Sequence, residues 1–178
     1  MSTKGPTLNF TCNARFENDF WLLNGDPDLA VIPEGQIKGI YKPMPIRLAY
    51  GNPSKYGSTH IMDRHGVWVN KFQPNQCVAT LVHLKLSQRG RAHATEDDNK
   101  MNLNLSIHPS GFMVLKNFGN YFSVTTLYFR NRKVDGQFLG TYKGHIWGVK
   151  PTKDIEVISL DSVSESVPAL IAITSENT

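Results

Sequence analysis

Ten residues in the first half of the chain bring together side chains that can transfer protons and bind anions. Residues 56–65 read Tyr-Gly-Ser-Thr-His-Ile-Met-Asp-Arg-His, and they follow a turn formed by residues 51–53. A short helix over this segment would place His60 and Arg64, four residues apart, on one face. Gly66 is expected to end that helix, because glycine accepts the left-handed conformation found at helix ends. The alternative is a surface helix whose histidines only cap and pack.

The charge of the chain is unevenly distributed. The 178 residues carry 19 basic and 15 acidic side chains, a net charge of +4. Residues 151–178 hold five acidic side chains and one basic one, which leaves 18 basic and 10 acidic side chains, a net of +8, in residues 1–150. A body this basic attracts polyanions, nucleic acid above all, although ordinary solubility charge is the competing explanation.

Composition excludes several classes of protein. The hydrophobic share of 40% and the aromatic share of 10% favour a folded core over disorder. No apolar run approaches the roughly 20 residues that cross a bilayer, and the N-terminus lacks a signal-peptide hydrophobic stretch, so we expect a cytoplasmic protein. Cys12 and Cys77 are isolated and indicate neither a metal site nor a disulfide framework.

The remaining pattern predicts a second helix and a set of strands. Residues 76–87 carry apolar side chains at three- and four-residue steps, which predicts an amphipathic helix with His83, Lys85 and Gln88 facing outward. The later segments alternate or are rich in β-branched and aromatic residues, and short turns between them predict an antiparallel meander. The expected strands are residues 29–32, 46–50, 91–95, 101–107, 112–116 and 121–129.

This order of strand, turn, histidine segment, helix and meander resembles the phage-associated nucleases of the barnase, EndoU, colicin and RelE group, the BECR fold. Their pattern has a glycine shortly before a His-Ile pair, then Arg-His, and a threonine in the last core strand. The positions that match are Gly57, His60, Ile61, Arg64, His65 and either Thr125 or Thr126. The resemblance covers about residues 46–130.

The resemblance implies an α+β fold in which N-terminal helices pack on an antiparallel β-meander. Residues 46–143 would form the nuclease core. Residues 1–45 would be an N-terminal extension and residues 144–178 an acidic C-terminal extension.

The resemblance also implies cleavage of RNA without metal or cofactor, in which the ribose 2′-hydroxyl attacks the phosphate and leaves a 2′,3′-cyclic phosphate. His60 and His65 are the candidate acid and base, in either assignment, because imidazole titrates near neutral pH. They are five residues apart, so at least one acts from a helix end or one is structural. Arg64 is the candidate phosphate ligand, since its planar fork matches two phosphate oxygens.

Strand residues complete the predicted site. Thr126 and Tyr128 share one face of a regular strand, while Thr125 falls on the other, so Thr126 pairs more naturally with Tyr128. Either threonine is a candidate hydrogen-bond donor to the phosphate. The side chains expected to hold flanking parts of the RNA are Lys55, Arg91, Lys116 and Arg130.

The expected partners are RNA, with tRNA among the candidates, and a neutralising immunity or antitoxin protein. A cytoplasmic ribonuclease acting as a toxin or phage effector needs such an inhibitor, or delivery away from its maker. Two alternatives stay open. A non-enzymatic basic protein that binds nucleic acid or blocks host machinery needs the same charge without titratable pairs. A metal-dependent nuclease is the weakest, because no third ligand accompanies His60 and His65.

Overall fold

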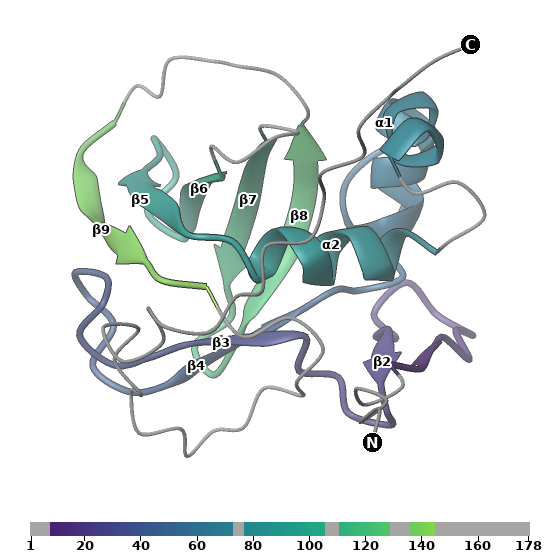
Figure 1. Cartoon of the computed structure of the whole chain (residues 1–178), viewed down its shortest axis with the longest axis horizontal. Coiled ribbons are helices and arrows are strands. Elements are labelled where there is room, and N and C mark those ends of the chain that lie inside the picture. The colour runs from purple at the N-terminus through teal and green to yellow at the C-terminus, as the bar shows by residue number, and fades with distance from the viewer. Residues whose placement is uncertain (1–7, 73–76, 106–110, 129–135, 145–178) are drawn as a thin grey trace, which may run out of the picture.

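The structure is a computed structural model that describes residues 8–72, 77–105, 111–128 and 136–144. Within these residues it is an α+β protein with two helices, a two-stranded sheet and a curled seven-stranded sheet (Figure 1). The helices are α1 (Gly57–Phe72) and α2 (Val78–Leu86). The strands are β1 (Phe10–Thr11), β2 (Leu22–Leu23), β3 (Ala30–Ile32), β4 (Met44–Arg47), β5 (Gly90–Ala94), β6 (Lys100–Leu105), β7 (Gly111–Asn117), β8 (Phe122–Tyr128) and β9 (Phe138–Tyr142).

The large sheet has the strand order β3-β4-β8-β7-β6-β5-β9. Strands β5 to β8 are consecutive and antiparallel, so the antiparallel meander predicted for this region is present. The sheet is nevertheless larger and mixed, because β4 runs parallel to β8, with Ile46 beside Phe122. Strand β9, which the sequence did not predict, adds to β5 at the far edge.

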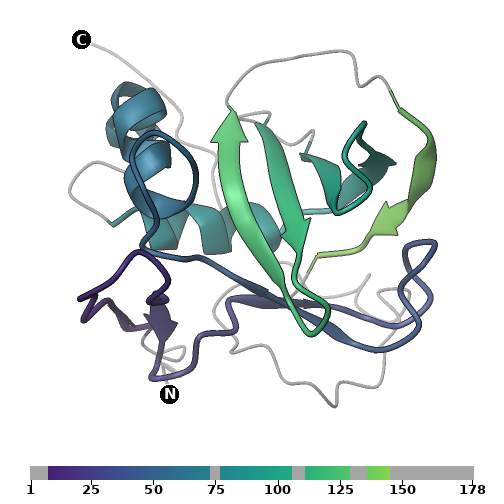
Figure 2. The same ribbon diagram turned by 180° about the vertical axis from the view of Figure 1, so that it is seen from behind.

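Helix α2 covers one face of this sheet and forms the core with it. Leu81 and Leu86 of the helix are buried together with Met113 and Leu115 of β7. Figure 1 shows α2 crossing in front of β7 and β8. Figure 2, seen from behind, shows the opposite face of the same two strands, where no helix of the described residues crosses them. The sheet therefore has a core face and an open face.

The prediction that Gly66 ends the first helix is wrong, because α1 continues to Phe72. Glycine inside a helix costs only about 1 kcal/mol relative to alanine. Val69 lies in the turn after Gly66 and is fully buried, on the same face as the buried Ile61. Burial of a valine side chain contributes about 1.5–3 kcal/mol, which outweighs the glycine.

Helix α2 confirms the predicted helix, but its outward face was predicted wrongly. His83 and Lys85 are fully buried. The Nδ1 atom of His83 donates a hydrogen bond to the carbonyl of Leu29, 2.8 Å away, and Phe10 packs edge-on against the His83 ring. Residues before β3 therefore cover His83 of α2, a long-range contact that helical periodicity does not contain.

Strands also pair across the boundary expected after residue 45. Strand β3 lies in the predicted N-terminal extension, yet it pairs with β4, and Ile37 forms a bridge with Gly140. Residues 145–178, nearly all of the predicted acidic extension, lie outside the described residues. Neither α1 nor α2 combines the length and apolarity that a bilayer-crossing helix needs.

Candidate nucleic-acid interface

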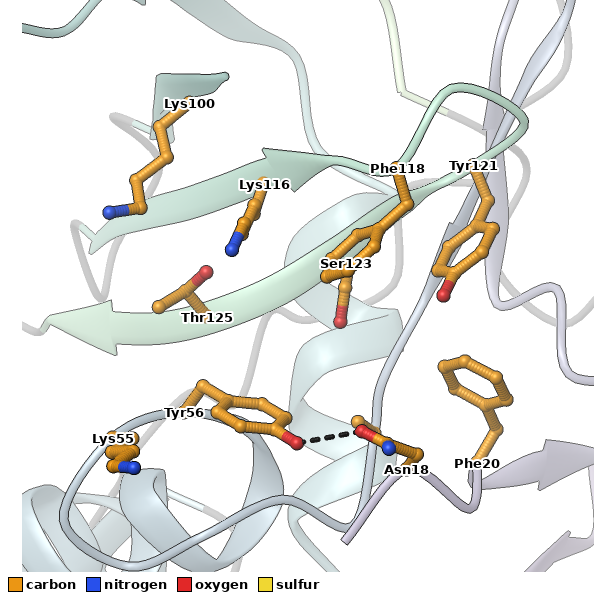
Figure 3. Close-up of a pocket in the computed structure, with 11 residues that line it drawn as sticks. Asn18, Phe20, Lys55, Tyr56, Lys100, Lys116, Phe118, Tyr121, Ser123 and Thr125 are labelled. Carbon is orange, nitrogen blue, oxygen red and sulfur yellow. Dashed lines mark hydrogen bonds between the residues drawn. The ribbon is translucent and has the colours of Figure 1, made fainter. Parts of the chain in front are cut away.

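An open cleft of about 690 Å³ lies on the open face of the sheet, between the strands and the loop that precedes α1 (Figure 3). We call it the basic cleft. Its lining contains three lysines, several hydroxyl groups and four aromatic rings, and none of these described lining residues is acidic. The lining residues are Asn18, Phe20, Ala49, Lys55, Tyr56, Lys100, Lys116, Phe118, Tyr121, Ser123 and Thr125.

The strands place two of the lysines side by side. Lys100 of β6 lies directly opposite Lys116 of β7, and Lys116 lies opposite Ser123 of β8. Like charges directly opposite each other in a sheet are destabilising. Asp97 offsets part of this repulsion with a salt bridge to Lys100 at 2.8 Å, and this hydrogen bond lowers the pKa of the Asp97 carboxyl. Lys116 is exposed, so the row presents positive charge to the solvent.

A β-bulge in β8 brings Thr125 into the same cleft. Thr126 pairs with Val114, but the next residue of β7, Leu115, pairs with Val124, which leaves Thr125 as the extra residue. Val124 and Leu127 are both fully buried in the core, although a regular strand would direct them to opposite faces. The prediction that Thr125 and Thr126 lie on opposite strand faces rested on regular alternation, and the bulge removes that premise.

The loop of residues 51–57 forms the facing wall of the cleft. Its ends meet closely, because Gly51 and Gly57 both have φ above +80°, and a Cβ on Gly57 would lie only 2.7 Å from the Cα of Gly51. The amide of Asn52 donates to the carbonyl of Tyr56 at 2.8 Å, and the reverse bond is 3.1 Å. This closed loop holds Lys55 and Tyr56 opposite the strands (Figure 3).

The Tyr56 hydroxyl is a proton donor inside the cleft. It donates a hydrogen bond to Oδ1 of Asn18 at 2.8 Å. Burial raises its pKa, with the nearby Glu17 carboxylate adding to the effect. The phenol therefore stays protonated at neutral pH and does not act as a base, and its single O–H is already donated to Asn18.

An aromatic wall closes one end of the cleft. The guanidinium carbon of Arg47 lies 4.7 Å from the centre of the Tyr121 ring and 5.6 Å from that of Phe20. Asp28 fixes the other side of this guanidinium through a 2.6 Å contact to Nε. Phe118 stacks on Tyr121 with ring centres 5.2 Å apart and planes 4° apart. The wall is thus held from behind by a salt bridge whose carboxylate is almost fully buried.

The predicted catalytic residues of α1 lie beside the cleft and do not line it. His60 is half-buried, and its Nδ1 lies 2.8 Å from the carbonyl of Pro53. Because a carbonyl only accepts, Nδ1 carries the proton in this contact and Nε2 is the other exchangeable position. Arg64 shares the helix face of His60 as predicted; its side chain is 61% exposed, with Asp63 3.5 Å away.

Helix α1 meets β8 at His65. The ring centres of His65 and Tyr128 are 5.1 Å apart in an edge-to-face contact. The neighbouring Thr126 is buried, and its Oγ1 has no hydrogen-bond partner among the residues that the structure describes. The structure therefore brings His65 into contact with Tyr128, both of them predicted site residues. Neither residue lines the cleft that contains Thr125.

The predicted RNA-contacting residues divide in the same way. Lys55 and Lys116 line the cleft, while Arg91 lies on β5 with its guanidinium 5.0 Å from the centre of the Phe138 ring. Arg130 is outside the described residues. His93 is buried beside Phe138. In the described part of the chain, His, Cys, Asp and Glu side chains form no group of three that could hold a metal ion.

Fold and site define an α+β protein with a basic, aromatic-walled cleft on its sheet. No protein-family profile matches the chain, and neither curated proteins nor solved structures provide a match. The sequence reasoning missed Lys100, Phe118 and Tyr121. A signal for them was present: antiparallel pairing of the predicted strands 101–107 and 112–116 brings Lys100 close to Lys116, and the turn after the second strand carries Phe118 and Tyr121.

Proposed function

We propose that this protein is a metal-independent endoribonuclease that binds its RNA in the basic cleft. The observation that supports the proposal most is the placement of Lys100 directly opposite Lys116, with Lys55 on the facing loop. Such a group of cations repels itself in the free protein and is neutralised by a polyanion. Hydroxyls of Ser123 and Thr125 in the same cleft supply hydrogen bonds that suit phosphate oxygens.

In the proposed reaction, the ribose 2′-oxygen attacks the adjacent phosphorus while a base removes its proton. The bond to the 5′-oxygen breaks while an acid protonates that oxygen, which leaves a 2′,3′-cyclic phosphate. His60 and His65 are the proposed acid and base. The hydrogen bond between Nδ1 of His60 and Pro53 fixes the ring and leaves Nε2 to exchange the proton. An RNA strand that leaves the cleft past Lys55 runs toward α1, which carries both histidines.

The test is cleavage of a mixed-sequence RNA in excess EDTA, with analysis of the product ends. We expect cyclic phosphate ends, no cleavage of the same strand made of deoxyribose, and a loss of about 10²- to 10⁴-fold in His60→Ala and His65→Ala. Met62→Ala, an exposed change on the same helix, is the matched control and should cleave like the wild type. Cleavage that stops in EDTA and returns with added metal would contradict the proposal.

A second candidate is a non-enzymatic nucleic-acid-binding or host-inhibiting protein. It is favoured by one observation, that neither His60 nor His65 is among the residues lining the cleft. Salt-sensitive RNA binding without any cleavage, unchanged in both alanine variants, would select this candidate over the nuclease.

The nuclease proposal extends to a toxin or phage effector with a neutralising protein partner. Expression of the wild-type chain should then arrest growth, and His60→Ala or His65→Ala should relieve the arrest at equal protein level. Equal toxicity of wild type and variants would contradict a toxicity based on RNA cleavage.

A further inference from the structure

We propose that the basic cleft selects unpaired RNA, because one base of the strand stacks on Phe118 while the adjoining phosphates contact Lys116, Lys100 and Lys55. This inference rests on the proposed function for the choice of RNA as ligand. It goes further in naming the structural state of the RNA and the side chain that recognises it.

The first support is the position of Phe118. This ring sits at the turn between β7 and β8 and is 50% exposed. The turn is well closed, since the Phe118 amide donates to the Tyr121 carbonyl at 3.0 Å and the Gly119 amide donates to Oδ1 of Asn117 at 2.7 Å. A large apolar side chain is therefore held in the solvent by a rigid turn, within the lining of a basic cleft.

The second support is the order of groups along the aromatic wall. The Lys116 ammonium, the Phe118 ring, the Tyr121 ring and the Arg47 guanidinium follow one another at 5.2, 5.2 and 4.7 Å. Figure 3 shows Lys116 on the side of Phe118 that faces away from Tyr121. Tyr121 thus lies between Phe118 and Arg47, and the other face of Phe118 carries Lys116, a flexible side chain that a base can displace.

Displacement of Lys116 from the ring gives its charge a stronger partner. A cation over an exposed aromatic ring contributes about 0.5–1 kcal/mol. A phosphate attached to the stacked base would offer Lys116 a charge-assisted hydrogen bond instead. Lys100 lies opposite Lys116 in the sheet, so the next phosphate along the strand meets a second ammonium without any movement of the backbone.

The third support is that stacking on this ring requires an unpaired base. Bases inside an A-form duplex are already stacked, and the deep, narrow major groove keeps protein side chains from them. An aromatic ring in a positively charged groove is instead the arrangement that binds single strands, where stacking contributes about 1–3 kcal/mol per base. The cleft volume of about 690 Å³ lies within the range of about 300–1,000 Å³ typical of small-ligand sites, so it has room for a nucleotide.

The experiment measures binding of a labelled, cleavage-resistant 2′-O-methyl RNA of about 12 nucleotides, a length within the site sizes of single-strand binders. Affinity is measured by fluorescence anisotropy for the single strand and for the same strand annealed to its complement. We expect tighter binding of the single strand, and a loss of about 5- to 150-fold in Phe118→Ala, the range that corresponds to one stacked base. Phe118→Trp should restore the affinity.

The matched control is Phe138→Ala. Phe138 is 46% exposed and has the Arg91 guanidinium over its ring, so it repeats the aromatic and cation pair of Phe118 and Lys116 on the edge strand β9. We expect single-strand affinity to be unchanged in this variant. Thermal melting of each variant checks that all are folded.

Equal affinity for single strand and duplex, or a Phe118→Ala variant that binds like the wild type, would overturn the inference. A loss in Phe138→Ala instead would move the stacking surface to the edge that carries Arg91 and also overturn it. Because the probe cannot be cleaved, Phe118-dependent binding would uphold the inference even where cleavage assays reject the nuclease.

Discussion

The two faces of the seven-stranded sheet place basic side chains in opposite surroundings. On the core face, His83 and Lys85 of α2 are fully buried; burial lowers the pKa of His83 and lowers that of Lys85 to about 8. On the open face, Lys55 and Lys116 are exposed around the basic cleft. A buried cation is disfavoured by lost hydration, whereas an exposed one is available to anions. Position relative to the sheet therefore decides which basic residues serve the fold and which serve a ligand.

The largest effect on stability is expected on the core face. Leu86→Ala removes a fully buried side chain from α2 and should lower the free energy of unfolding by about 2–5 kcal/mol. Chemical denaturation measures this loss. RNA affinity per folded molecule should stay at the wild-type value, since Leu86 is on the opposite side of the sheet from the cleft. A specific loss of affinity in folded protein would break the distinction between the two faces.

The next effect concerns the loop that forms the wall of the open face. Gly57→Ala puts a Cβ at a residue with φ +85°, 2.7 Å from the Cα of Gly51, and should destabilise the protein by about 1–3 kcal/mol through backbone strain. It should also weaken RNA binding, because the same loop holds Lys55 and Tyr56.

Gly66→Ala on the same helix is the matched control for Gly57→Ala. A Cβ at Gly66 would make only an ordinary 3.6 Å contact with Met62, so this change should stabilise α1 by about 0.5–1 kcal/mol. Thermal melting should show a lower melting temperature for Gly57→Ala and a higher one for Gly66→Ala. Equal shifts in the two variants would show that the loop is not held by close glycine packing.

A further expected effect is a dependence of stability on pH that comes from the buried Lys85 of the core face. The pKa of Lys85 is lowered to about 8 in the folded protein, against an ordinary value of 10.5. Between these values the unfolded chain binds the additional proton, so the free energy of unfolding should rise as pH increases from about 8 toward 10. Denaturation at pH 7.5, 8.5 and 9.5 should show this rise.

Lys85→Met should flatten that rise, because it removes the buried ammonium. Lys116→Met on the open face should retain the rise. If Lys85→Met keeps the wild-type pH dependence, or Lys116→Met loses it, the assignment of the buried cation is wrong.

Local pattern predicted most elements of this fold. The meander and α2 follow from periodicity, and the pairing of β6 with β7 follows from their order in the meander. Burial of His83 did not, because it depends on Leu29 and Phe10, residues more than 50 positions away in the sequence. The continuation of α1 beyond Gly66 depends similarly on tertiary burial of Val69.

The candidate site was predictable only in part. The histidine segment correctly indicated the helix beside the cleft, and Lys55 and Lys116 were identified as charges for RNA. The placement of Thr125 relative to Thr126 was not predictable by alternation, since one extra residue in β8 changes which side chains share a face. By residue type, Phe118 and Tyr121 look like ordinary core aromatics. Only the geometry of the turn between β7 and β8 places them in the cleft lining.

The central claim, that the open face binds RNA through the basic cleft, is tested most directly by two variants of equal charge. One carries Lys100→Gln and Lys116→Gln; the other carries Lys38→Gln and Lys143→Gln, two exposed lysines outside the cleft lining. Affinity for single-stranded RNA is measured across salt concentrations. The cleft variant should bind more weakly and lose about 1.4 from the slope of log affinity against log salt, about 0.7 per lost contact, while the control keeps the wild-type slope. Equal losses in both variants would show that overall charge, and not the cleft, attracts the RNA.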